Sequence, residues 1–228
     1  MIKVRRIICL IICIIAIIAS VFMRLSIKNT YNMESTREEL LVPYFTESIV
    51  NMLSPLEKKL SKSSIIIVGK ATGKFEYVYR NLWQEVNVTT VIKGKDMVSE
   101  GTTIKVVGSG QIVSTYDKNY YVKEKAGRTY VDTSFLDYMR KDDEYLIFID
   151  RKVNIASDEV YSLNQKAVTM QYLNLTRDES QICSENENDY TVCEVQYKKV
   201  QGSEFVTNSE TALKKFYKIK HRLIKRLL

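Results

Sequence analysis

The stretch Ser64-Ile65-Ile66-Ile67-Val68-Gly69-Lys70-Ala71-Thr72-Gly73 decides how this chain folds. Its four consecutive β-branched residues, Ile65 to Val68, are typical of a strand that is buried on both faces or crosses a barrel. Gly69 and Gly73 then allow a bulge or a sharp coiling of the strand. The sequence therefore predicts a buried, curved strand that begins near residue 65.

Further extended segments follow at intervals of roughly ten to twenty residues. Val86, Val88, Thr90 and Ile92 mark one face of a second strand, which should follow a turn at Asn81-Leu82 and end at Lys93-Gly94-Lys95. Other strands are expected at 102–107, 128–133, 145–149, 168–175 and around 184–190, with a hairpin between 111–116 and 120–125. Because no long helix separates these strands, the pattern predicts an antiparallel sandwich or small barrel.

Helices are expected mainly at the edges of this β-region. Ser54-Pro55-Leu56-Glu57 is a helix start signal, and the helix should run to about Lys62. A single helical turn is expected at Phe135 to Arg140. The predicted organisation is a basic start and anchor (1–27), a stalk with short helices (28–62), a β-barrel domain (63–206) and a C-terminal basic amphipathic helix (207–228).

Four segments also carry a family resemblance: 64–73, then 85–94 ending in Val-Ile-Lys-Gly, then 101–106, then Asp-Glu-Tyr-Leu-Ile-Phe at 143–148. Together they resemble uncharacterised secreted or membrane-anchored bacterial proteins with an OB-like barrel of the tissue-inhibitor and netrin type. The resemblance covers about residues 64–150 and implies a five-stranded barrel with insertions and no active site. Cysteines are missing at the start of the domain, so protease inhibition is not carried over.

The N-terminal segment predicts a membrane location. Lys3, Arg5 and Arg6 precede an almost unbroken apolar run from Ile7 to Met23, which makes roughly 25 Å of helix and reaches the lower end of a bilayer core. We expect an uncleaved signal anchor, the alternatives being a cleaved signal peptide and a buried soluble helix. The basic start should stay in the cytoplasm, which places the remaining chain on the extracytoplasmic side of a single-pass cell-membrane protein.

The net charge of +7 is concentrated at the two ends of the chain. Residues 1–28 hold five basic side chains and no acids, and residues 210–228 hold seven basic side chains against Glu210. The remaining residues 29–209 hold 22 basic and 26 acidic side chains, so the globular part is mildly acidic. This distribution argues against nucleic acid as a partner.

Cys183 and Cys193 bracket a polar loop between two short extended arms. A disulfide between them would close a loop of about 11 residues and stabilise the fold by roughly 3 kcal/mol outside the cell. Two free thiols are the alternative. A metal site is not expected, because two cysteines without a nearby histidine do not complete the usual ligand set.

No catalytic constellation is evident in the sequence. The single histidine, His221, lies in the basic tail, and Gly108-Ser109-Gly110 is not a nucleophile elbow. Acid pairs such as Asp142-Asp143 could in principle support glycoside chemistry, but adjacent acids in polar stretches are usually solvated turns. We therefore predict neither a catalytic residue nor a cofactor.

The C-terminal helix carries the remaining functional signal. Its apolar residues fall on one face, which Lys220 interrupts: Leu213, Phe216, Tyr217, Leu223, Ile224 and Leu227. Basic residues occupy the rest: Lys214, Lys215, Lys218, Arg222, Lys225 and Arg226. Either the basic face contacts anionic lipid or wall polymer, or the apolar stripe merely caps the β-domain, and both can hold at once.

The sequence thus predicts a membrane-anchored extracytoplasmic binding module without an active site. Its partners would be the bilayer, through the N-terminal helix, and an anionic lipid or polymer or an unknown protein. The alternatives are a cell-envelope enzyme that uses carboxylates and a structural or assembly subunit of a membrane complex.

Overall fold

The structure is a computed structural model, which describes residues 11–21, 41–78, 81–108, 112–114, 129–131, 137–155, 158–180, 182–183 and 194–228. The chain divides into two compact units, Met1–Arg37 and Glu38–Leu228. In the first unit, residues 11–21 are helical, and their isoleucines are about half exposed or more. Within the described residues, no helix has both the length and the apolar character needed to cross a membrane. Residues 1–10 and 22–27 of the predicted anchor lie outside the described residues.

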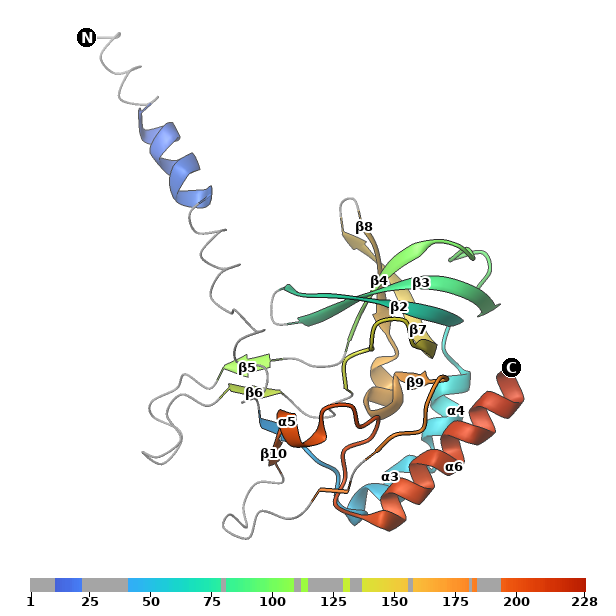
Figure 1. Cartoon of the computed structure of the whole chain (residues 1–228). Coiled ribbons are helices and arrows are strands. Elements are labelled where there is room, and N and C mark those ends of the chain that lie inside the picture. The colour runs from blue at the N-terminus through green and yellow to red at the C-terminus, as the bar shows by residue number, and fades with distance from the viewer. Residues whose placement is uncertain are drawn as a thin grey trace, which may run out of the picture. The chain divides into compact units, whose positions relative to one another are not determined.

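The second unit is mainly β, as predicted, and is built on a six-stranded sheet (Figure 1). The strand order is β2 (Ile65–Val78), β3 (Asn81–Lys93), β4 (Thr103–Val107), β8 (Asp158–Leu163), β7 (Glu144–Ile155) and β9 (Tyr172–Asn174). β4 and β8 run parallel, and the other pairs are antiparallel. β2 also pairs with β7, so the pairings of β2, β3, β4, β8 and β7 form a closed circuit.

The run Ile65 to Val68 lies at the centre of this sheet, where β2 pairs with β3 on one edge and with β7 on the other. Ile65 and Ile67 point into one core cluster, made mostly of side chains from the strands of the circuit. Ile66 and Val68 point into a second cluster on the opposite face, which they share with Phe148 and the helices. The predicted burial on both faces is therefore confirmed.

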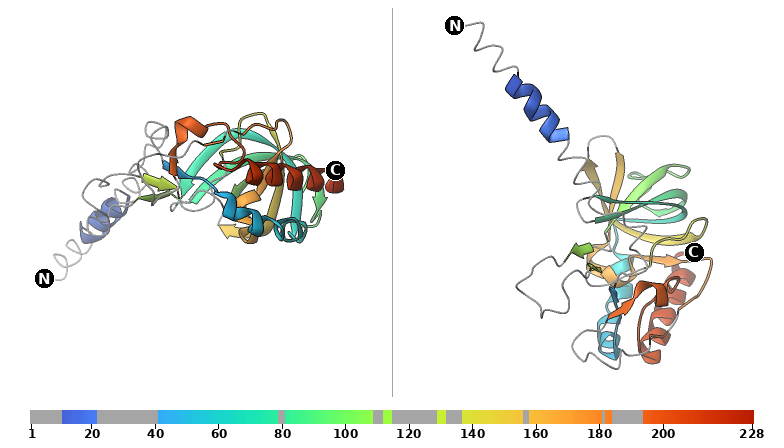
Figure 2. Two further views of the ribbon diagram at one scale, coloured as in Figure 1. Left: turned by 90° about the horizontal axis from the view of Figure 1, so that it is seen from below. Right: turned by 60° about the vertical axis from the view of Figure 1, so that its left-hand side comes forward.

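Five helical segments contribute to the second core: η2 (Glu47–Ile49), α3 (Val50–Leu53), α4 (Leu56–Ser61), η3 (Gln165–Met170) and α6 (Glu210–Leu227). Leu53 and Leu60 are fully buried beside Phe216 and Leu223 of α6. Figure 2 shows α6 running alongside α3 and α4. The predicted helix that starts near Ser54 is thus present as α4. α4 lies in the compact unit Glu38–Leu228, where Leu56 and Leu60 are buried in the second core.

A small second sheet has the strand order β10 (Glu194–Gln196), β1 (Leu41–Pro43), β6 (Thr129–Val131) and β5 (Ile112–Ser114). A short helix, α5 (Tyr197–Val200), follows β10. The predicted hairpin assigned 120–125 as the partner of β5, whereas β5 pairs with β6. Residues 120–125 and 184–190, where extended arms were expected, lie outside the described residues.

Two further local predictions are wrong. Asn81 already pairs with Val78 inside the β2–β3 ladder, so the turn does not lie at Asn81-Leu82. Residues 165–170 form η3 before β9 begins, which replaces the first half of the strand predicted at 168–175.

Residues 137–140 are not helical, although a helical turn was predicted there. The backbone N–H groups of Tyr138, Met139 and Arg140 donate instead to Asp137 Oδ1, Gln84 Oε1 and the Tyr145 hydroxyl. Because these partners are side chains, two of them from other strands, the donors of this segment are satisfied without helical hydrogen bonds.

Gly94 closes β3 with φ +87°, and a Cβ there would lie 2.9 Å from Ile65 Cγ1 and 3.1 Å from the Ser64 carbonyl oxygen. We expect Gly94→Ala to lower the free energy of unfolding by about 3 kcal/mol, since left-handed strain and overpacking add. Gly101→Ala is the matched control, because Gly101 has φ +78° but no atom within 4 Å; it should cost about 1 kcal/mol. Urea unfolding of the full chain, followed by Trp83 fluorescence, measures both. Equal losses would contradict the steric argument.

Candidate functional site

The candidate site is the outer face of α6, and the helix is held in place by its inner face. Ser209 caps the first turn, its hydroxyl accepting from the Ala212 N–H. Phe216, Ile219 and Leu223 are fully buried in the second core, and the Phe216 ring stacks on Phe205 at 4.6 Å between centroids. The apolar stripe therefore caps the β-domain, as one of the two sequence interpretations expected.

Lys220, which interrupts the apolar stripe, is 1% exposed and forms an internal ion-pair cluster. Its Nζ lies 2.6 Å from Glu204 Oε2 and 2.6 Å from Asp178 Oδ1, and it donates to the Arg177 carbonyl at 3.1 Å. Burial raises the pKa of Glu204 to about 7, against the opposing effect of the Lys220 charge. A buried ammonium needs such partners, so the cluster fixes the rotation of α6 about its axis.

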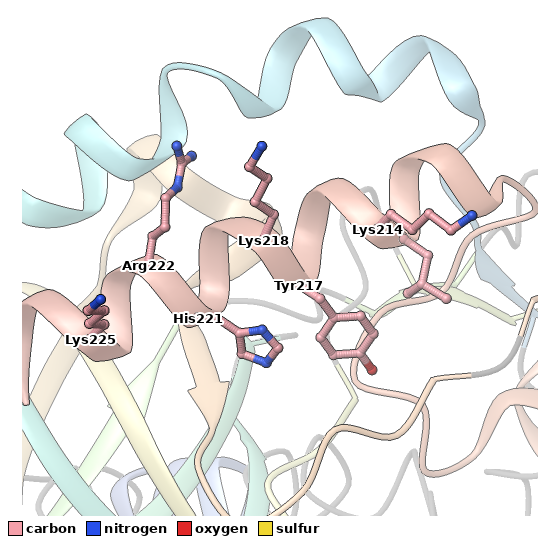
Figure 3. A pocket seen from close by; sticks show the side chains of 7 residues that line it. Lys214, Tyr217, Lys218, His221, Arg222 and Lys225 are labelled. Carbon is pink, nitrogen blue, oxygen red and sulfur yellow. The ribbon is translucent and has the colours of Figure 1, made fainter.

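α6 carries the six basic residues predicted as an anionic-surface contact. Lys214, Lys218, Arg222 and Lys225 line a shallow hollow of about 600 Å³ together with Leu213, Tyr217 and His221 (Figure 3). Lys215 and Arg226 lie on the same helix but do not line this hollow. The structure thus brings four of the six predicted cations together on one face.

Acidic partners divide these cations into two groups. Arg222 and Arg226 both pair with Glu57 of α4, at 2.8 Å and 3.2 Å. Lys214 pairs with Glu210 at 3.4 Å, where both side chains are largely exposed, so this pair contributes little. Within the described part of the chain, Lys215, Lys218 and Lys225 have no ion-pair partner. The face therefore keeps a net positive charge.

The two aromatic rings of the hollow are engaged with the domain. The Tyr217 hydroxyl donates to Ser180 Oγ at 2.7 Å, and burial raises the pKa of Tyr217 to about 12. His221 Nε2 lies 2.7 Å from Asp178 Oδ2, and the two rings are 6.0 Å apart between centroids. These contacts tie α6 to the segment 178–180. The cations, rather than the rings, are the groups left to meet a ligand.

A second polar cluster surrounds Asp137. Its carboxylate accepts from the Tyr197 hydroxyl at 2.6 Å and from the N–H groups of Tyr138 and Gly202, both at 2.8 Å. Burial raises the pKa of Asp137, although these hydrogen bonds oppose the shift. The adjoining cavity measures about 20 Å³, which is about the size of one water molecule. The geometry is that of a structural tie between loops rather than a substrate site.

The acid pair considered for carboxylate chemistry is split between two environments. Asp143 is buried and accepts from Arg177 at 2.7 Å and from Asn174 Nδ2 at 2.8 Å, whereas Asp142 is exposed and pairs with Lys70 at 3.1 Å. In the described ranges, no group of three or more His, Cys, Asp or Glu side chains is placed to hold a metal ion.

Cys183 is a free cysteine in the structure, and burial raises the pKa of its thiol to about 11. Its predicted partner, Cys193, lies outside the described residues, so the disulfide stays a prediction. Sequence reasoning missed Glu57, Asp178 and Glu204, which set the charge on the two faces of α6. No local sequence signal identifies these acids, because they lie in other segments of the chain and contact α6 only in the folded domain.

Comparison with known proteins assigns no family to this chain. No protein-family model matches the sequence, and no curated protein matches it. The resemblance to tissue-inhibitor and netrin-type domains therefore stays a prediction, and the charges and contacts of α6 carry the functional interpretation.

The Lys220 cluster generates a prediction that depends on pH. Lys220→Met leaves Glu204 buried without its cation, so we expect a loss of about 3–5 kcal/mol in unfolding free energy at pH 8. At pH 5 the loss should be smaller, because Glu204, with its raised pKa, is then protonated and neutral. Urea unfolding at both pH values measures the difference, and Lys214→Met, at an exposed position of the same helix, is the control.

The direction in which Glu204 makes the free energy of unfolding depend on pH is also testable with Lys220 in place. A carboxyl whose pKa rises from 4.5 to about 7 on folding contributes stability below about pH 4.5, and this contribution is lost as pH rises through 7. Glu204→Gln should remove that part of the pH dependence. A loss for Lys220→Met that is the same at pH 5 and pH 8 would contradict the assignment.

Proposed function

We propose that this protein is a membrane-anchored extracytoplasmic interaction module whose α6 presents cations to an anionic partner. The observation that carries the proposal is the division of α6 into two faces. Phe216, Ile219, Lys220 and Leu223 are buried in the domain, whereas Lys214, Lys218, Arg222 and Lys225 line one outward hollow. A rigidly held cationic face needs little ordering when it binds, which favours recognition.

The scaffold beneath α6 is proposed to be an OB-like barrel. Support comes from the closed circuit of pairings through β2, β3, β4, β8 and β7, because closure is how small β-domains remove exposed edges. The register shifts in the β2–β3 ladder near Gly69 and Gly73 give β2 the bends that closure needs. In this proposal the barrel positions α6 and has no catalytic role.

The proposed anchor is the N-terminal apolar segment. Support comes from residues 11–21, which are helical and apolar, with Ile12 60% and Ile17 64% exposed. A helix with isoleucine on every side has no favourable place in water, whereas a bilayer accommodates it. The basic residues that precede it favour a cytoplasmic N-terminus.

We propose binding rather than catalysis because the carboxylates of the two buried polar clusters already have hydrogen-bond partners within the domain. Asp137 accepts three hydrogen bonds, and Asp143 is held by Arg177 and Asn174. An enzyme would instead need acids and bases directed into a cavity that admits a substrate. The α6 hollow is shallow, and the groups that line it are mainly cations.

The proposed topology predicts the result of protease shaving. In intact cells that carry a tag after Leu228, external protease should remove the tag, while the untreated protein pellets with membranes at full length. The reason is that the anchor holds the N-terminus inside and leaves the domain outside. A fully protected tag in intact cells, lost only after lysis, would refute the extracytoplasmic placement.

The cationic face predicts the behaviour of a charge-reversed variant. The comparison uses two triple variants. The first carries Lys214→Glu, Lys218→Glu and Lys225→Glu on α6. The second, the control, carries Lys95→Glu, Lys198→Glu and Lys199→Glu at exposed positions outside α6. Both triple variants lose the same net charge. The full chain, held in nanodiscs of zwitterionic lipid, should bind a sulfopropyl matrix through α6, so the first variant should elute at about half the salt concentration of the second.

Circular dichroism of both triple variants serves as the folding control for this comparison. Equal elution of the two variants would refute the proposal, because the contact would then depend on overall charge rather than on α6.

A further inference from the structure

The cations of the hollow form a row along α6. Lys214, Lys218 and Arg222 follow one another at four-residue spacing, and Lys225 continues the row. At 1.5 Å per residue, neighbouring positions are about 6 Å apart and the row is about 16 Å long. Figure 3 shows Lys214 and Lys225 towards its two ends. The positive charge is thus spread along a line rather than gathered at a point.

The same geometry argues against insertion of α6 into a bilayer. An amphipathic helix binds lipid by burying its apolar face among the acyl chains. Here Phe216, Ile219 and Leu223 are already buried in the second core, and the Tyr217 hydroxyl is bonded to Ser180. Contact with a ligand is therefore left to the charged groups.

Acidic side chains flank the row and restrict what can bind across it. Glu57 lies beside Arg222, and Glu210 lies at the start of the helix beside Lys214. The domain outside the termini is mildly acidic as well, with 22 basic against 26 acidic residues in 29–209. An extended anionic surface would meet these acids together with the lysines, whereas a narrow chain along the helix would meet mainly cations.

We propose that the α6 row binds a linear polyanion, an unbranched polymer with a phosphate in every repeat unit, which lies along the helix axis. This inference rests on the proposed function and names its partner. The row has no convergent set of donors for one isolated anion, and its regular spacing suits successive charges of a polymer. Because the contacts are electrostatic, each cation adds to affinity through counterion release.

The test uses the full chain in zwitterionic nanodiscs and end-labelled inorganic polyphosphate of graded length, with binding read by fluorescence anisotropy. Affinity should rise with polymer length until the polymer covers about 16 Å and then change only slowly. The slope of log K against log salt should be about −3, as expected for four contacts with a flexible polyanion.

Two variants test the row itself. Thr211 is exposed and lies one turn before Lys214, so Thr211→Lys extends the row to about 21 Å. It should move the length plateau to longer polymers and steepen the salt slope by about 0.7. Lys218→Gln should make the slope shallower by a similar amount. Ser99→Lys, which adds the same charge at an exposed position outside α6, should leave the plateau unchanged.

Several outcomes would overturn the inference. Affinity for orthophosphate equal to that for long chains would indicate a site for a single anion. Binding to phosphatidylglycerol vesicles without binding to polyphosphate would identify a lipid surface and leave the proposed function standing. If the protein binds neither polyphosphate nor these vesicles, and the two triple variants elute equally from the sulfopropyl matrix, the proposed function is refuted as well.

Discussion

The fold depends on one strand segment that serves two cores at once. Ile65 and Ile67 complete the core among the strands, while Ile66 and Val68 complete the core beneath the helices. Because successive side chains of a strand point to opposite faces, a shift of one residue would exchange the two sets. Pairing with both β3 and β7 holds the register. The helices, including α6, pack on the face of the sheet that Ile66 and Val68 make apolar, outside the strand circuit.

The position of the cationic face follows from a contact inside the domain. Lys220 reaches Glu204 and Asp178 on the buried side of α6, and a helix with one side chain held in this way cannot turn about its axis without stranding a charge. Lys214, Lys218 and Lys225 lie on the opposite side as a direct result. The buried ion pair thus adds to the orientation that the buried side chains Phe216, Ile219 and Leu223 already impose on α6.

Local patterns in the sequence predicted the parts of this structure that local physics decides. The β-branched run, the start of α4, the mainly β class and the cations of α6 could all be predicted from neighbouring residues. The conformation of residues 137–140 could not, because Gln84 and Tyr145 take their backbone donors. The sequence also did not show which cations of α6 have an acidic partner, because Arg226 pairs with Glu57, 169 residues earlier in the chain. Contacts between distant segments, rather than propensity, determine these features.

The second core joins Leu53, near the start of the domain, to Leu223 in α6. Its completion is therefore tied to the direction of synthesis. Until the ribosome has released α6, Phe148 and Leu60 lack their covering helix, and the nascent domain exposes an apolar surface of the kind that chaperones and proteases recognise. A premature stop before α6 would leave that surface permanently open. Among the segments of the second core, α6 is thus the last to be synthesised and the one that completes it.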